Sequence, residues 1–169
     1  MQDTVPLDAE TKVAERPGDH KAELRLWLRI FTCKMLIEAE VRKRLRQQFD
    51  MTLPRFDLMA QLDRAPNGMT LGELSQRMMV TNGNITGLVD RLEDQGLVKR
   101  RPSPHDRRVQ YVALTANGRK FFRTMAKANA DWVAEFFAEL SGDDIEQLMR
   151  ALAKTKASAG KAVRNGDAR

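Results

Sequence analysis

The sequence is poor in the residues that build disulfide frameworks and metal sites. Of its 169 residues, one is cysteine and two are histidine. A lone thiol cannot build a disulfide framework within the chain, and one Cys with two His is too few for the usual structural zinc site. We therefore predict that the chain holds no metal ion and no cofactor.

Long apolar runs are also absent. No stretch approaches the roughly 18 consecutive apolar residues of a membrane-spanning helix. The first 20 residues carry several carboxylates and lack the apolar segment of a secretory signal. We expect no membrane partner and a cytoplasmic location.

The chain lacks the motifs of a catalyst. His20 falls in an irregular N-terminal segment and His105 in a turn-rich loop, so neither is expected to be held rigidly beside a nucleophile. The sequence contains no glycine-rich phosphate loop and no metal-ligand spacing. We predict no catalytic residues, and a protein that is not an enzyme.

What the chain has is positive charge and helical patterning. Lys and Arg number 29 against 23 Asp and Glu, which gives a formal net charge of +6 and favours a nucleic-acid partner. Apolar residues recur at three- and four-residue spacing from Lys21 to about Phe49 and again beyond Thr115. We predict a flexible arm at 1–20, a single domain at 21–159 and a flexible basic tail at 160–169.

The middle of the domain, 54–115, combines short helices with two β-prone runs. Thr70 and Glu73 have the spacing of a capping box, and Ile85, Val89 and Leu92 share one helix face. The runs 97–101 and 109–114 flank a turn-rich segment, which predicts a hairpin. The fold class is therefore mainly α with a small β-hairpin wing: a winged helix-turn-helix lobe beside a helical region.

The second helix of this lobe has the polar face of a DNA-recognition helix. Short amide and hydroxyl side chains near a helix N-terminus can reach base edges in the major groove. The predicted contacts are Thr81, Asn82, Asn84, Thr86 and Arg91. Gly83 and Gly87 lie among them, and two explanations are open: simple tolerance of glycine, or close approach of the helix backbone to DNA.

The hairpin supplies cations. Between Lys99 and Arg108 the chain has five cations and one anion. Arginine side chains suit a narrow minor groove, although a solvated basic loop is an alternative. The predicted wing contacts are Arg100, Arg101, Arg107 and Arg108, with Asp106 orienting Arg108.

Three motifs together resemble the MarR family of bacterial transcription regulators. They are NITGLVDRLEDQGLV at 84–98, DRR at 106–108 and LTANG at 114–118. The resemblance covers about 22–158 and implies a homodimer, held by helices at 21–50 and 116–159, on a pseudo-palindromic double-stranded operator. It also implies that Arg108 enters the minor groove, and that the protein is a nucleoid-associated repressor.

The dimer also has support from the apolar residues themselves. The chain has more apolar surface than one small lobe can cover, and such surface usually marks an interface. It comes from the apolar residues between Trp132 and Leu152 and from those between Leu24 and Met35. Intrachain core is the alternative for part of this set.

The resemblance further implies a small-molecule effector, for which we predict an aromatic acid or its acyl-coenzyme A thioester and a role in aromatic-acid catabolism. Lys21, Arg25 and Arg29 form a cationic ridge at four-residue spacing on the first helix. The candidate wall residues are Trp27, Phe31, Met35, Phe56, Met59 and Phe122. Alternatively, the wall residues belong to the hydrophobic core. The cationic ridge would then be solvated, or neutralised by the second chain or by DNA phosphate.

Two further functions stay open. Cys33 lies in the first helix, where some members of the resembled family carry a peroxide-sensing thiol, but its neighbours Phe31 and Met35 are apolar and a buried thiol is inert. The other is a winged-helix interaction module that has lost DNA binding, which would lack the polar recognition face.

Overall fold

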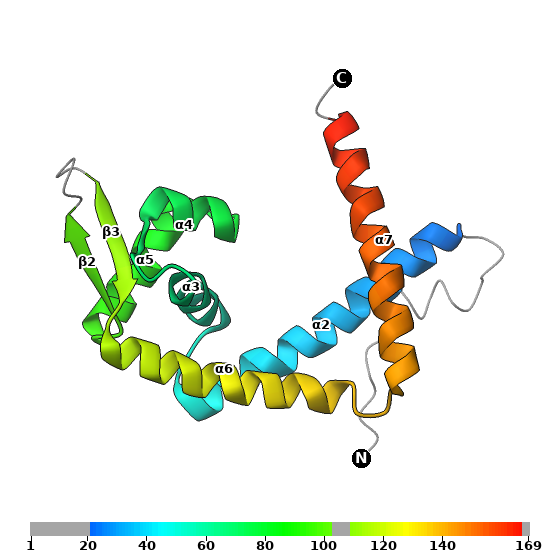
Figure 1. Cartoon of the computed structure of the whole chain (residues 1–169), viewed down its shortest axis with the longest axis horizontal. Coiled ribbons are helices and arrows are strands. Elements are labelled where there is room, and N and C mark those ends of the chain that lie inside the picture. Colours follow the sequence, from blue (N-terminus) through cyan, green and yellow to red (C-terminus); the bar gives the residue numbers. More distant parts are fainter. Residues whose placement is uncertain (1–20, 103–108, 167–169) are drawn as a thin grey trace, which may run out of the picture. The chain divides into compact units, whose positions relative to one another are not determined.

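The computed structural model describes residues 21–102 and 109–166. The predicted wing residues Asp106, Arg107 and Arg108 therefore lie outside the described residues. The described chain divides into two compact units, the first ending at Ala130 and the second beginning at Asp131. In chain order the elements are α2 (Ala22–Phe49), α3 (Leu53–Asp63), β1 (Met69–Thr70), α4 (Leu71–Met78), α5 (Asn82–Asp94), β2 (Val98–Pro102), β3 (Gln110–Leu114), α6 (Ala116–Phe136) and α7 (Gly142–Gly166) (Figure 1).

The first unit contains the winged lobe that the sequence predicts. Helices α3, α4 and α5 contact one another and gather beside the strands (Figure 1). The sheet is antiparallel with the order β1-β3-β2, so β3 is its central strand. Strand β1 escapes prediction because its two residues are too few for a period-two pattern.

Apolar stripes from the three helices meet the sheet in one core. Leu74 of α4, Ile85 of α5 and Val112 of β3 are each completely buried. Burying such a side chain stabilises the fold by about 1.5–3 kcal/mol. This core holds α5 by one face only, which leaves its other face exposed.

Local capping signals act where the sequence predicts them. The Thr70 hydroxyl oxygen accepts from the Glu73 N–H at 3.2 Å, and the Thr70 N–H donates to the Glu73 carboxylate at 2.7 Å. Gly96, directly after the C-cap of α5, has a φ of +66° and so ends this helix in the left-handed conformation that glycine adopts readily. At Gly118 a Cβ would lie 1.8 Å from the carbonyl oxygen of Leu97, so only glycine lets α6 approach the wing this closely.

In the second unit, α7 extends further than predicted. The prediction of a flexible tail beginning at Gly160 is wrong for 160–166, because the helix continues to Gly166. Alanine, lysine and arginine follow Gly160, and these helix formers sustain the helix although one interior glycine costs about 1 kcal/mol. No residue of α7 is buried, and this helix lies wholly within the described residues.

Candidate nucleic-acid interface

The start of α5 presents the predicted polar side chains to solvent. Thr81 is the N-cap, and its hydroxyl oxygen accepts from the Asn84 N–H at 3.4 Å. The Thr86 hydroxyl donates to the carbonyl oxygen of Asn82 at 3.0 Å. All five predicted recognition residues are exposed, including Arg91 near the other end of the helix. The structure thus brings them onto one helix, with the amide groups of Asn82 and Asn84 close to its N-terminus.

The centre of the exposed face of α5 is bare backbone. Ile85, Val89 and Leu92 are buried, and Gly87 lies two residues from the first two of them. Two residues along an α-helix correspond to a rotation of about 200°, so Gly87 points away from the core. A Cβ at Gly83 or Gly87 would meet no atom within 4 Å. Nothing within the described chain therefore requires glycine at either position.

The turn before α5 carries an exposed apolar side chain. Met79 ends α4 in the left-handed conformation, with a φ of +54°, and is 92% exposed. Non-glycine residues rarely adopt this conformation. Because the recognition helix begins three residues later, the exposed methionine borders the predicted DNA face.

Arg100 joins the wing to α5. Its guanidinium forms ion pairs with Asp90 and with Glu93, and its backbone N–H donates to the Glu93 carboxylate at 3.0 Å. The hydrogen bond to Asp90 and the charge of Glu93 raise the pKa of the Arg100 guanidinium above its ordinary value. The guanidinium donors of Arg100 that could bind a DNA phosphate are therefore already occupied by two carboxylates of the same chain.

The two carboxylates that hold Arg100 were missed from the sequence. Asp90 and Glu93 are three residues apart, which places them on one side of the helix before the strand. This spacing could have predicted a partner for a cation of the strand. Lys99 and Arg101 on the same strand are exposed. Among the described wing cations, these two are placed for an outside partner, whereas Arg107 and Arg108 lie outside the described residues.

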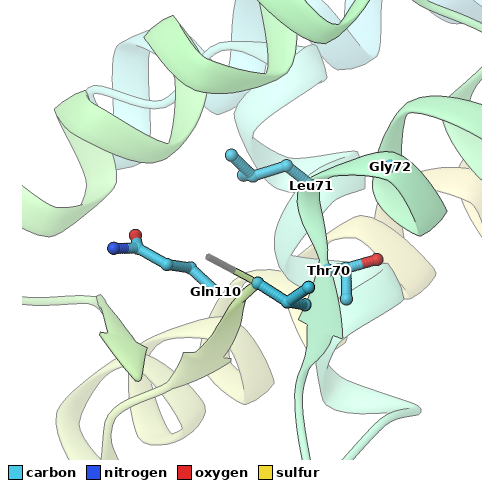
Figure 2. Close-up of a pocket in the computed structure, with 5 residues that line it drawn as sticks. Thr70, Leu71, Gly72 and Gln110 are labelled. Carbon is cyan, nitrogen blue, oxygen red and sulfur yellow. The ribbon is translucent and has the colours of Figure 1, made fainter. Parts of the chain in front are cut away.

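A pocket of about 490 Å³ lies where β3 meets the start of α4 (Figure 2). The side chains of Leu71 and Gln110 extend to the same side, whereas the Thr70 hydroxyl points away from them (Figure 2). The pocket is lined by Thr70, Leu71, Gly72, Val109 and Gln110. None of these residues belongs to the site predicted from the sequence.

The predicted effector residues fall into two groups. Phe56, Met59 and Phe122 are buried, and the rings of Phe56 and Phe122 lie 5.5 Å apart. The exposed aromatic pair Trp27 and Phe31 lies on α2, with ring centroids 5.9 Å apart. The first group is core of the lobe, as the alternative interpretation holds, and the second lies on the surface of α2 with the half-exposed Met35.

The cationic ridge follows the start of α2. Lys21 and Arg29 are exposed and Arg25 is half-buried. The Arg25 Nε is buried and has no hydrogen-bond partner among the described residues. Cys33 is exposed, contrary to the expectation from its neighbours, because Phe31 and Met35 are themselves exposed on this helix.

Two kinds of site are absent from residues 21–102 and 109–166. No three His, Cys, Asp or Glu side chains gather there as metal ligands would. No helix in these ranges is both long and apolar enough to cross a membrane.

Comparison with known proteins places this geometry in a family. The MarR family model matches residues 49–109, which include α3, α4, α5 and β2. The transcriptional activatory protein BadR of Rhodopseudomonas palustris is 29% identical over 80% of this chain and 78% of its own length. A crystal structure of a MarR family transcriptional regulator from Silicibacter pomeroyi is 32% identical, with a TM-score of 0.69 over 81% of this chain and 94% of that one.

One similar structure was solved as a complex with DNA. A mutant of MarR from Escherichia coli complexed with operator DNA is 26% identical, with a TM-score of 0.65 over 75% of this chain and 89% of that one. The exposed polar start of α5, the adjoining wing and these likenesses agree. The chain belongs to the MarR family of winged-helix, DNA-binding transcription regulators.

Proposed function

We propose that the protein binds a pseudo-palindromic operator as a homodimer, with one winged lobe on each half-site. The observation that carries the proposal is the recognition helix, whose exposed face is polar or bare while its opposite face is completely buried. In a two-fold dimer the α5 helices would enter successive major grooves, about 34 Å or 10 bp apart. Lys99 and Arg101 add positive charge beside the helix.

Exposed apolar side chains support the dimer. On α2, Trp27 is 58% exposed and Leu36 is 65% exposed. On α7, Ile145, Leu148 and Leu152 share one face at three- and four-residue spacing, and each is more than 40% exposed. Exposed apolar patches of this kind usually mark interfaces. We infer that the second copy of the chain covers them.

A charge introduced on the apolar face of α7 tests the dimer. Leu148→Glu is expected to convert the dimer into a monomer, because it places a carboxylate in the apolar interface. Lys154→Glu, on the opposite side of α7, is the matched control and is expected to leave the dimer intact. Sedimentation velocity at micromolar concentration distinguishes the two, and an unchanged dimer in Leu148→Glu would remove this face from the interface.

DNA binding by the wing is tested through its salt dependence. Operator affinity is expected to fall with a log–log slope of about −0.9 per phosphate neutralised. Arg108→Ala is expected to weaken a gel shift of the promoter DNA strongly while the thermal unfolding curve stays unchanged. An undiminished shift by that variant would remove Arg108 from the interface.

We further propose that the regulator is a repressor released by an aromatic acid or its acyl-coenzyme A thioester. The support is the exposed ring pair of Trp27 and Phe31 on α2, together with the Arg25 guanidinium on the same helix, whose Nε lacks a hydrogen-bond partner within the described chain. Isothermal titration with such acids and thioesters tests the proposal. Binding of none of them, with operator binding intact, would remove it. Tighter operator binding with ligand would favour activation instead, in line with the name of BadR.

A peroxide response through Cys33 is the second candidate, favoured by the exposure of this thiol. Oxidation requires an accessible thiolate, so exposure is necessary for it. The test is operator affinity before and after mild peroxide treatment, with Cys33→Ser as the control. An affinity that does not change would dispose of the redox role.

A further inference from the structure

One arginine joins the ends of three helices in the first unit. In the first turn of α3, the Arg55 Nη2 donates to the carbonyl oxygen of Asp50 at 2.9 Å, and its Nε donates to the Thr52 hydroxyl at 3.2 Å. Its Nη1 donates to the Gln95 side-chain oxygen at 3.3 Å. Asp50 is the C-cap of α2, Thr52 the N-cap of α3 and Gln95 the C-cap of α5. A single guanidinium therefore spans the ends of α2, α3 and the recognition helix.

The local rules of helix α3 do not favour an arginine here. The first turn of a helix favours acidic side chains, and an N-cap threonine usually accepts a hydrogen bond from a backbone N–H. Thr52 makes no such capping bond, and its hydroxyl accepts from Arg55 instead. A residue that opposes local preference is explained by what it does elsewhere in the fold.

The rules at the other two helix ends do favour it. A cation is stabilised near a helix C-terminus, where backbone carbonyl oxygens lack intrahelical partners. Arg55 donates to the backbone carbonyl oxygen of Asp50 at the end of α2, and to the side-chain oxygen of Gln95, the C-cap of α5. The planar fork of donors allows one arginine to reach all three acceptors, which the compact ammonium group of lysine cannot match.

We propose that Arg55 is a positioning residue that fixes the recognition helix to the end of α2 and so sets the half-site spacing that the dimer accepts. The inference rests on the proposed function, in which α2 belongs to the dimer interface. The distance between the two recognition helices sets the half-site spacing. How rigidly each helix is held relative to the two-fold axis sets how strictly the dimer selects that spacing. Without the Arg55 contacts, α5 has more freedom relative to α2, and operators of neighbouring spacing bind almost as well as the natural one.

The test compares three operators: the natural one, one shortened by a base pair and one lengthened by a base pair. Arg55→Met keeps the aliphatic stem of the side chain but removes its donors. Gln95→Ala removes only the contact with α5. Wild type is expected to prefer the natural spacing at least tenfold, and both variants are expected to reduce that preference to about twofold. Arg123→Ala, an exposed cation on α6, is the control and is expected to retain the full preference.

A second readout separates positioning from direct contact. If Arg55 contacted a phosphate, its loss would change the log–log salt slope by about 0.9. Positioning leaves the slope unchanged. A changed slope, an equal loss of affinity on all three operators, or an undiminished preference would each overturn the proposal. If Arg55→Met fails to fold, the exposed Gln95→Ala carries the test alone.

Failure of the proposed function gives a different result. Wild type would then fail to distinguish the operator from a scrambled duplex, whatever the spacing. If wild type prefers one spacing and both variants keep this preference, only the role of Arg55 is contradicted.

Discussion

Replacing Gly87 by alanine should stabilise the protein and weaken its binding to DNA. Gly87 lies inside α5, and its added Cβ would meet no atom within 4 Å. Alanine is more favourable than glycine in a helix interior by about 0.5–1 kcal/mol. For a chain of this size, that gain raises the melting temperature by about 1–4 °C.

The effect on DNA binding has the opposite sign. If the bare face of α5 lies against DNA, the added methyl group occupies space that the complex has closed. Overpacking a close contact costs about 1–3 kcal/mol. That free energy corresponds to a fall in affinity of about 5- to 150-fold. Stability and affinity therefore change in opposite directions, which simple tolerance of glycine does not predict.

The assay pairs thermal unfolding with operator titration by fluorescence anisotropy. Gly160→Ala is the matched control, because Gly160 lies in the interior of α7 and a Cβ added there would meet only the flexible end of Arg164, at 3.6 Å. This control is expected to stabilise the protein with no effect on DNA binding. If Gly87→Ala binds the operator with wild-type affinity, the α5 backbone does not approach DNA closely at Gly87. A lowered melting temperature of this variant would show that the space around Gly87 is not open.

Three further predictions concern charge and capping. Thr70→Ala is expected to destabilise the fold by about 1 kcal/mol in urea unfolding, whereas Thr70→Ser keeps the cap. Burial, with a further contribution from Glu38, raises the pKa of Asp57 above its ordinary value, so stability declines as the pH rises through that raised pKa. Asp57→Asn should remove this decline in urea unfolding across acidic to neutral pH, and an unchanged pH profile would contradict the assignment. Arg101→Met should change the log–log salt slope of operator binding by about 0.9. Arg100→Met should leave this slope unchanged, because carboxylates already occupy the Arg100 guanidinium. Equal slopes in the two variants would show that the two arginines do not differ in their contact with phosphate.

Short-range signals made most of the winged lobe predictable. The Thr70–Glu73 box and the stripe of Ile85, Val89 and Leu92 each depend on residues within one or two helical turns. The structure places both as the sequence predicts. Strand β1 was not predictable in this way, because its two residues form a strand only by pairing with β3. In that pairing Met69 lies opposite Val112, which is 43 residues further along the chain.

The tertiary contacts of the site needed the structure. The pairing of Arg100 with Asp90 and Glu93 joins residues up to 10 positions apart, and the bond of Arg55 to Gln95 joins residues 40 apart. From the sequence, Arg100 is one of several wing cations, and nothing distinguishes it from Arg101. The extent of α7 was missed because Gly160 resembles a helix end, although exposed helix formers on both sides continue the helix.

The central claim is that two chains present paired recognition helices to one duplex. The most direct measurement is the mass of the complex with its operator in native mass spectrometry, with a scrambled duplex as the reference. We predict two chains on each operator duplex and little complex with the scrambled one. A single chain on the operator, or equal complex formation with both duplexes, would contradict the claim.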